Sequence, residues 1–328
     1  MAEPLSIQTS LDAAIRMAAE VRTGLTAERP WLPCKYFYDD RGSELFERIT
    51  RLPEYYQTRT EEALLESIAR DVIARIRPTE LVELGSGAGR KIAFLLEAMA
   101  RTGQAARLVL FDINALFVDE SARRIAARFP DAEVQGVTGD FTQDLAALGP
   151  GGGRLAVFLA GTIGNLHPDD VPSFLARVAQ QLEPGDGLLV GIDLVKDVGR
   201  LEAAYNDAEG VTAEFNRNVL RHCNNVLGAD FDVDAWEHVA FFDARKSWIE
   251  MRLRATRDCR VGIPAAELEI NFRAGDEIST EISCKYSLES FVQRLESTGL
   301  SLDRWYTDEE NLFALALLRR VRTPLRLV

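Results

Sequence analysis

The sequence predicts an α/β fold in which a doubly wound, Rossmann-like sheet is joined to a second lobe of mixed α and β structure. From residue 58 to about residue 193, apolar strands alternate with amphipathic helices, a pattern typical of a parallel sheet covered on both faces. After residue 195 the pattern changes to a helical stretch and then to runs with a period of two. This change predicts an inserted lobe of helices and antiparallel strands.

The alternating region supplies the strands of the sheet and the helices that cover it. Short apolar runs predict five parallel strands, at residues 80–84, 106–113, 132–140, 154–162 and 187–195. Amphipathic helices are predicted at residues 58–76, 91–100, 115–129 and 169–182. In the first of these helices, Thr58 and Glu61 have the spacing of a capping box, so we expect the helix to begin there.

The inserted lobe is predicted as a helical stretch at 198–227 and period-two runs at 237–261 and 267–287. The doubly wound pattern then resumes with a helix at 287–300 and strands at 302–308 and 312–320. Only a short polar loop joins these last strands, so we expect an antiparallel hairpin on the edge of the sheet. The predicted domains are a sheet domain of residues 61–195 and 286–328 and a second lobe of residues 1–60 and 196–285.

The charge of the chain argues against nucleic acid as a partner. Lys and Arg number 38 against 51 Asp and Glu, a formal net charge of −13, and so negative a protein repels a phosphate backbone. The N-terminus lacks a basic segment followed by an apolar block, and no apolar run is long enough to span a bilayer. We therefore expect a cytoplasmic monomer with no membrane partner.

Neither the cysteines nor the histidines have the spacing of a metal site. The four cysteines are widely scattered without a CxxC pair, and the three histidines have no ligand spacing. We expect buried or incidental thiols, no disulfide framework and no bound metal.

A glycine-rich loop follows the first predicted strand and leads directly into a helix. Such a loop lets the backbone approach a ligand closely. Gly85, Gly87 and Gly89 have the spacing GxGxG, whereas dinucleotide-binding loops have GxGxxG. Glu83 lies two residues before the first glycine, where a carboxylate would repel a pyrophosphate but suit an ammonium group.

S-adenosylmethionine fits this loop because it carries an ammonium group and no phosphate. Its carboxylate could pair with Lys91 or Arg90 just beyond the glycines. Asp112 ends the second predicted strand, where a carboxylate can accept hydrogen bonds from the two hydroxyls of a ribose. Asp140 and Phe141 follow the third strand and offer an acceptor for an adenine amine and a ring to cover its face.

The structural alternative is that Asp112 and Asp140 only cap helices. For either residue alone this alternative is as good as the binding role. Three sites at successive strand ends form the ordered set that a nucleoside-binding crevice requires, and this order favours binding.

Three other stretches carry a resemblance to a known family: KYFYDDRGSELFERITRLPEYYQTRTE at 35–61, LAGTIGNLHPDD at 159–170 and ISTEISCKYS at 278–287. They closely resemble the bacterial L-histidine-specific Nα-methyltransferases of ergothioneine biosynthesis, and the likeness runs over nearly the whole chain. The resemblance implies transfer of three methyl groups from S-adenosylmethionine to the α-amine of L-histidine, which gives the betaine hercynine. The final helix and two strands are also what a Rossmann-like methyltransferase has after its fifth strand.

The resemblance implies site residues at the matching positions of this sequence. Cofactor contacts fall on Gly85, Lys91, Asp112, Asp140 and Phe141, to which the loop itself adds Glu83 and Gly87. Contacts to the amino acid backbone fall on Tyr55, Asn165 and Tyr205, and contacts to the imidazole on Glu281 and Ser283. Tyr38 and Thr162 are implied near the methylated nitrogen, and Met251 is expected under the substrate ring. Tyr38 and Asn165 are the candidate catalytic residues.

These residue types suit methyl transfer to an amine. Displacement at a sulfonium methyl needs position and alignment more than a covalent nucleophile. Neutral donors can hold the carboxylate of the amino acid, so the site needs no cation near the positively charged sulfonium. Glu281 can accept a ring N–H while Ser283 serves the other ring nitrogen, and a site built on such bonds rejects analogues that lack them.

Each substrate residue also has a purely structural interpretation. Tyr55 could be a packing aromatic, Asn165 a turn residue, Glu281 an exposed strand position and Met251 a core filler. Three separate segments that match one family favour the functional interpretation. The proton acceptor is not evident, and we expect water, helped by Tyr38, to deprotonate the amine.

Three other functions are weighed against this one. An N-methyltransferase of another amino acid such as tryptophan is the main alternative, and Glu281 with Ser283 argues against it because an indole has no second ring nitrogen. A nicotinamide dehydrogenase is disfavoured by the GxGxG spacing and Glu83. A catalytically silent ligand-binding module is disfavoured by the complete set of cofactor residues.

Overall fold

The computed structural model describes residues 7–103, 106–149 and 152–321. Residues 1–6 of the predicted second lobe and 322–328 of the predicted sheet domain lie outside the described residues. The chain forms two compact units. Unit 1 contains the chain up to Ile49, Leu201–Asp243 and Ile249–Ile282. Unit 2 contains Thr50–Arg200, Ala244–Trp248 and the chain from Ser283.

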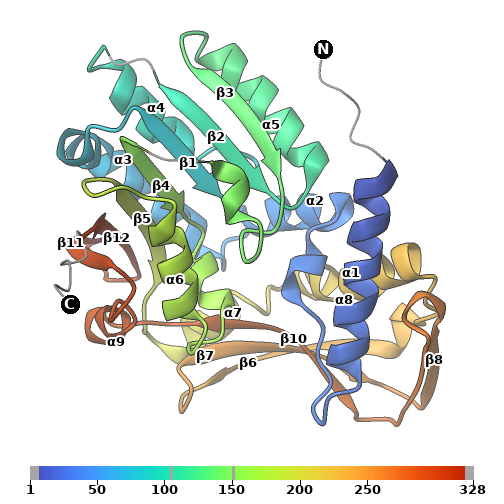
Figure 1. Cartoon of the computed structure of the whole chain (residues 1–328). Helices are drawn as coiled ribbons and strands as arrows, with labels where there is room; N and C mark the ends of the chain where they lie inside the picture. The colour runs from blue at the N-terminus through green and yellow to red at the C-terminus, as the bar shows by residue number, and fades with distance from the viewer. Residues whose placement is uncertain (1–6, 104–105, 150–151, 322–328) are drawn as a thin grey trace, which may run out of the picture. The chain divides into compact units, whose positions relative to one another are not determined.

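Unit 2 is built on one seven-stranded sheet (Figure 1). Its strands lie in the order β11 (Leu300–Thr307), β12 (Phe313–Arg320), β5 (Gly187–Asp193), β4 (Arg154–Phe158), β1 (Glu80–Leu84), β2 (Arg107–Asp112) and β3 (Glu133–Thr138). Strands β1 to β5 pair in parallel, whereas β12 is antiparallel to both β5 and β11. This confirms the predicted doubly wound sheet with an antiparallel hairpin on its edge.

The strand order reverses between β1 and β4. The chain builds β1, β2 and β3 outward in one direction and then returns to place β4 on the other side of β1. Ligands of open parallel sheets bind outside the carboxyl ends of the strands at such a reversal. The five parallel strands end there at Leu84, Asp112, Thr138, Phe158 and Asp193.

The central strands are covered on both faces. Every residue of β1, β4 and β5 is buried, as expected for parallel strands between helices. Helices α3 (Tyr56–Ile76) and α4 (Ile92–Ala100) share one hydrophobic core with these strands. The other helices of the unit are α5 (Ala115–Arg128), α6 (Val171–Gln180) and α9 (Leu288–Gln293).

Three predicted helix boundaries are wrong. Helix α3 begins at Tyr56, two residues before Thr58, and Glu61 bonds to other segments instead of closing a capping box. The predicted helix at 287–300 ends at Gln293. The predicted helix at 198–227 is two helices, α7 (Val198–Ala203) and α8 (Val211–Leu227). Asp207 breaks it, because its carboxylate accepts the N–H groups of Val211 and Thr212 at 2.8 Å each and starts a new helix.

Unit 1 combines helices with antiparallel strands. Its helices are α1 (Ile7–Leu25), α2 (Asp40–Ile49) and α8. A three-stranded sheet has the order β10 (Glu277–Cys284), β7 (Trp248–Ala255) and β6 (Trp236–Asp243), and β8 (Cys259–Ile263) pairs with β9 (Leu268–Phe272). The last two residues of β10 and the first residue of β7 belong to unit 2. No helix within the described ranges of the chain is long and apolar enough to cross a membrane.

Candidate active site

The loop after β1 owes its shape to its three glycines. Gly85, Gly87 and Gly89 all have left-handed backbone angles, with φ of 72°, 48° and 57°. Glycine adopts these angles without the steric cost that a side chain imposes. Gly89 also lies under α5, because a Cβ there would be 2.8 Å from Cδ1 of Ile125. The GxGxG spacing is thus explained by backbone conformation and by helix packing.

Two side chains hold the glycine loop in place. Asp112, at the end of β2, accepts the N–H of Gly87 at 2.8 Å and that of Asn114 at 3.1 Å. Ser121 of α5 donates to the carbonyl of Gly87 at 2.9 Å. Burial raises the pKa of Asp112, and these backbone N–H groups oppose that rise. Asp112 therefore fixes the loop backbone, in addition to any role toward a ribose.

Glu83 is a buried carboxyl group at the end of β1. It is 3% exposed, and its Oε2 has no hydrogen-bond partner among the described residues. The hydroxyl of Ser86 is also buried and has no hydrogen-bond partner among the described residues. Burial raises the pKa of Glu83 from 4.5 to about 8, and Lys91 opposes the rise. A buried acceptor without a partner costs free energy, so this position suits a ligand that brings its own cation, such as an ammonium group.

Phe141 lies next to the glycine loop. A Cβ on Gly85 would be 3.7 Å from Cε1 of Phe141. The ring packs edge-on against Phe158 and Phe174, with centroids 5.1 and 6.0 Å away. Asp140 accepts the N–H of Thr142 at 2.8 Å and its hydroxyl at 2.6 Å. Asp140 therefore closes a local turn and does not cap a helix, because the short helix that follows, Leu145–Leu148, has Asp144 as its N-cap residue.

Glu61 of α3 links the glycine loop to the segment after β4. Its side chain is fully buried and forms an ion pair with Lys91, and it accepts the N–H of Ala160 at 2.9 Å. Ala160 has a left-handed φ of 63°, which is rare for a residue with a side chain. We did not predict Glu61 as a site residue. The sequence signal for this contact is Gly191, because a glycine inside a strand marks a close approach of another group. A Cβ at Gly191 would lie 2.0 Å from the Glu61 carboxylate.

The segment after β4 is a tight turn that packs against the end of β10. Gly161 has a φ of 66°, and Thr162–Asn165 form a single 3₁₀ turn. The hydroxyl of Thr162 donates to the carbonyl of Leu159 at 2.7 Å. A Cβ on Gly164 would lie 2.8 Å from the carbonyl oxygen of Cys284 and 3.5 Å from Oγ of Ser283. Unit 2 thus brings the turn that carries Thr162 and Asn165 next to Ser283.

Tyr55 lies where α3 begins. It is 8% exposed and is the N-cap residue of the helix. Its carbonyl accepts Nη1 of Arg59 at 3.1 Å. The next residue, Tyr56, donates its hydroxyl to Asp193 at the end of β5, at 2.8 Å. The start of α3 is thereby fixed against the carboxyl edge of the sheet.

Three of the predicted substrate residues belong to unit 1 and share a buried polar network. Nε2 of His238 is 2.9 Å from the carbonyl of Tyr205, and Nδ1 is 2.8 Å from the amide of Asn216. Asn216 accepts the hydroxyl of Thr280 at 2.6 Å, and that hydroxyl is 3.2 Å from the carbonyl of Met251. Since Glu281 follows Thr280, the network connects the backbones that carry Tyr205, Met251 and Glu281.

This network fixes the tautomer of the His238 ring. The amide of Asn216 can only donate to Nδ1, so Nε2 carries the proton that goes to Tyr205. Burial lowers the pKa of His238, and the bond to Tyr205 opposes the change. Neither His238 nor Asn216 belongs to a motif, so the sequence offered no signal for either.

Tyr38 lies in an aromatic cluster of unit 1. Its ring meets Phe46 and Phe215 edge-on, with centroids 5.6 and 5.5 Å apart. Its backbone N–H caps the short helix Cys34–Phe37 by donating to Lys35. The cluster holds the phenol in a defined place.

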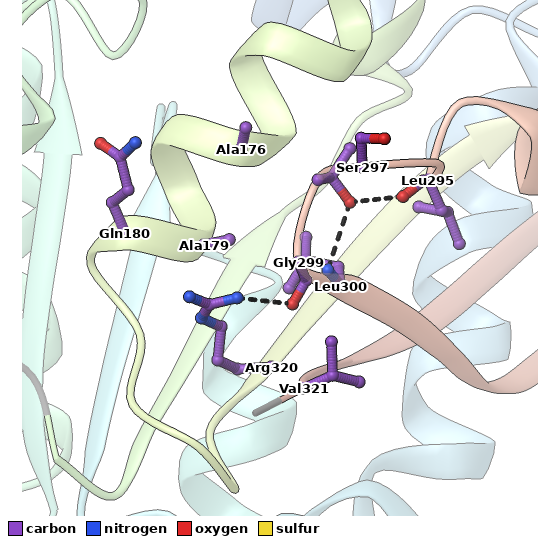
Figure 2. Close-up of a pocket in the computed structure, with 10 residues that line it drawn as sticks. Ala176, Ala179, Gln180, Leu295, Ser297, Gly299, Leu300, Arg320 and Val321 are labelled. Atoms are coloured by element: carbon purple, nitrogen blue, oxygen red, sulfur yellow. Dashed lines mark hydrogen bonds between the residues drawn. The ribbon is translucent and has the colours of Figure 1, made fainter. Parts of the chain in front are cut away.

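A pocket of unit 2 lies away from the glycine loop and contains no predicted site residue (Figure 2). Arg320 points across it and donates to the carbonyl of Gly299 at 2.9 Å. Its neighbour Arg319 pairs with Gly187, at the amino end of β5. The pocket therefore lies at the amino ends of the parallel strands, whereas the glycine loop lies at their carboxyl ends. It is lined by Ala176, Ala179, Gln180, Leu295, Ser297, Thr298, Gly299, Leu300, Arg320 and Val321.

The predicted site residues divide between the units. Unit 2 contains all the predicted cofactor residues together with Tyr55, Thr162, Asn165 and Ser283, and unit 1 contains Tyr38, Tyr205, Met251 and Glu281. In the described part of the chain, no three of His, Cys, Asp and Glu gather in a group that could hold a metal ion.

Comparison with known proteins finds similar enzymes over most of the chain. Histidine N-alpha-methyltransferase of Mycolicibacterium smegmatis is 47% identical over 94% of this chain and 96% of that protein. Its counterpart in Mycobacterium tuberculosis is 45% identical over 92% of this chain and 94% of that protein. Ergothioneine biosynthesis protein 1 of Neurospora crassa is 32% identical over 88% of this chain and 33% of that longer protein.

A family model described as "Histidine-specific methyltransferase, SAM-dependent" matches residues 17–320. The match contains both the glycine loop and the turn after β4, and it extends through both units. It confirms the resemblance found in the sequence motifs. The chain belongs to the family of S-adenosylmethionine-dependent, histidine-specific methyltransferases.

Proposed function

We propose that this protein transfers three methyl groups from S-adenosylmethionine to the α-amine of L-histidine and so makes hercynine for ergothioneine biosynthesis. The observation that carries the proposal is the match of residues 17–320 to a histidine-specific family. The names of the mycobacterial and fungal relatives support the substrate and the pathway. We also propose that the enzyme is a cytoplasmic monomer, with a cofactor core at 61–195 and 286–328 and a substrate lobe at 1–60 and 196–285.

The residues of unit 2 suit the cofactor. S-adenosylmethionine would supply an electrophilic methyl group on its sulfonium when bound. Glu83 would pair with the ammonium group of the cofactor, and Lys91 with its carboxylate. Asp112 would hold the ribose while Gly85 and Gly87 allow close approach. Asp140 and Phe141 would bind the adenine.

The substrate residues would hold a zwitterion and its heterocycle. The amino acid backbone would be bound by Tyr55, Asn165 and Tyr205. These are neutral donors, so they add no positive charge near the sulfonium. Glu281 would accept a ring N–H and Ser283 would serve the other ring nitrogen. Both residues lie on β10 and are two positions apart, so their side chains leave the same face of the strand.

The amine must be a free base before each transfer. Asn165 and Thr162 would orient it, because alignment of donor and acceptor is the main contribution that a protein makes to such a displacement. Met251 would pack under the ring. Water, helped by Tyr38, would take the proton that each methylated amine must lose before the next step.

Mass spectrometry tests this function directly. Purified protein is incubated with S-adenosylmethionine and each of the twenty amino acids. We expect only histidine to gain methyl groups, up to three. Glu281→Ala should lose turnover of histidine and keep its affinity for the cofactor. If tryptophan or another amino acid is methylated and histidine is not, the main alternative function is correct.

A further inference from the structure

A buried ion-pair cluster lies at the carboxyl end of β5 in unit 2. Asp193 is 4% exposed and accepts the hydroxyl of Tyr56 at 2.8 Å. Its Oδ2 is 2.8 Å from Nζ of Lys285, and its Oδ1 pairs with Lys196. Burial alone would raise the pKa of Asp193, but the two ammonium groups lower it below its usual value. One carboxylate thus serves two lysines.

Lys285 and Lys196 differ in their contacts beyond Asp193, because Nζ of Lys196 donates to the hydroxyl of Tyr56 at 2.6 Å. Nζ of Lys285 is instead 2.8 Å from Oγ of Ser283, the residue assigned above to the imidazole. The Lys285 side chain is fully buried. The backbone N–H of Lys285 donates to the carbonyl of Ser247 at 2.8 Å, and the carbonyl of Lys285 accepts the hydroxyl of Ser247 at 3.0 Å. Lys285 is therefore held at its backbone by Ser247 and at its tip by Asp193.

The direction of the hydrogen bond between Lys285 and Ser283 is determined by the ammonium group. An ammonium group has three protons and no lone pair, so it can only donate. Oγ of Ser283 must accept from it with one of its two lone pairs, so the hydroxyl proton of Ser283 points away from Lys285. A residue in this arrangement suits a partner that accepts a hydrogen bond.

We propose that Lys285, held by Asp193, is a positioning residue that makes Ser283 a hydrogen-bond donor to the substrate ring. The inference rests on the proposed function, in which Glu281 accepts the N–H of the other ring nitrogen. One acceptor and one donor together fit a neutral imidazole in a single tautomer.

Substitution of the two lysines separates this role from a structural one. Lys285→Met and Lys196→Met each remove one lysine from Asp193, and Lys196→Met also removes the hydrogen bond that the hydroxyl of Tyr56 accepts. Only Lys285→Met removes the contact to Ser283. The substrates are histidine and the two pyrrolylalanine isomers, which keep one ring N–H and lack the acceptor nitrogen.

We expect the wild type to prefer histidine over the better pyrrole isomer, measured as a ratio of kcat/KM. Lys285→Met should reduce this preference by about 10- to 100-fold, because the donor to the ring nitrogen is no longer oriented. Lys196→Met should keep the wild-type ratio. Ser283→Ala should reduce the preference as far as Lys285→Met does, and the double variant should reduce it no further.

A wild-type ratio in Lys285→Met, together with a reduced ratio in Ser283→Ala, would overturn the inference. A measurement on the unmodified protein covers the case in which Lys285→Met does not fold. Nitrogen NMR of labelled histidine, bound with S-adenosylhomocysteine at pH 7, should show one protonated and one unprotonated ring nitrogen, whereas two protonated nitrogens would contradict the inference. If the wild type does not methylate histidine at all, the proposed function fails before this inference is tested.

Discussion

At the scale of single residues, Glu83 is a buried carboxyl group that reduces stability and that we propose as the partner of the cofactor's ammonium group. Its buried carboxyl group has a pKa of about 8 against an ordinary value of 4.5. The folded, cofactor-free protein keeps the proton well above pH 4.5, whereas the unfolded chain loses it there. The stability that this group contributes is therefore fully present below pH 4.5 and is lost as the pH rises through 8.

We expect Glu83→Gln to have opposite effects on affinity and stability. Binding of S-adenosylmethionine should weaken by about 10- to 100-fold, because a hydrogen bond between charged partners contributes about 1.5–3 kcal/mol. The Tm of the cofactor-free variant should exceed that of the wild type at pH 8 by more than at pH 5.5, since glutamine does not titrate. Calorimetry and thermal unfolding measure the two effects. Glu66→Gln, an exposed position on α3, is the control, and unchanged affinity in Glu83→Gln would refute the ammonium contact.

His238 is expected to make the stability of unit 1 depend on pH. Its pKa is lowered in the folded state from the ordinary 6.5, chiefly by burial. The unfolded chain takes up a proton below pH 6.5 before the folded protein does, so stability is fully present above pH 6.5 and is lost as the pH falls. The Tm should decrease between pH 7 and pH 5, and less so in His238→Gln. His167→Gln, which replaces a half-exposed ring, should follow the wild type. Identical pH dependence in all three proteins would show that His238 has no such role.

At the scale of structural elements, the turn after β4 depends on Gly164. An alanine Cβ there would meet backbone atoms of Cys284 at 2.8 and 3.1 Å, and backbone cannot move aside as a flexible side chain can. Gly164→Ala should therefore displace the turn that carries Thr162 and Asn165. We expect kcat/KM for histidine to fall about tenfold or more, with a loss of stability of about 1–3 kcal/mol.

Gly103→Ala is the matched control for Gly164→Ala. Gly103 has a φ of 73°, and no described atom lies within 4 Å of the place that an alanine Cβ would take there. Its substitution should cost about 1–2 kcal/mol of stability from backbone strain alone and leave the kinetics with histidine unchanged. Wild-type kinetics in Gly164→Ala would show that the turn tolerates displacement.

At the scale of the whole molecule, binding of the two ligands should be coupled through Glu61. This carboxylate holds both Lys91, beside the cofactor loop, and the N–H of Ala160, in the turn before Asn165. A ligand that pairs with Lys91 would weaken the ion pair between Lys91 and Glu61, and Glu61 also holds the turn after β4. Coupling between two sites is reciprocal and typically amounts to about 5- to 150-fold in affinity.

We therefore expect histidine to bind at least about fivefold more tightly when S-adenosylhomocysteine is present. Glu61→Gln should reduce this factor, because the amide can still accept from Ala160 but no longer forms an ion pair with Lys91. Glu66→Gln on the same helix should not. Calorimetric titration of histidine with and without S-adenosylhomocysteine measures the factor in each protein. Equal affinities in the wild type would mean that the sites are independent.

The predicted monomer is tested by mass. Light scattering during gel filtration should give 36.5 kDa, the mass of one chain. A net charge of −13 favours a single copy through mutual repulsion. A mass twice as large, independent of salt, would contradict the prediction.

Local order in the sequence was enough to predict the sheet and the glycine loop. The strands, the terminal hairpin and the three glycines are set by hydrophobic period and by backbone angles, which depend on residues close in the chain. Helix boundaries were less predictable, because the carboxylate of Asp207 ends one predicted helix and Tyr56 begins another before its expected cap.

The sequence by itself thus determined the fold class, the glycine loop and, through its motifs, the family. Only the tertiary structure decided which polar groups work together. Glu61 meets Ala160 across 99 positions of the chain, and Tyr56 meets Asp193 across 137. The physical reason is that a buried charge must find its partners in space, and a partner so far away in the chain leaves no periodic trace in the sequence.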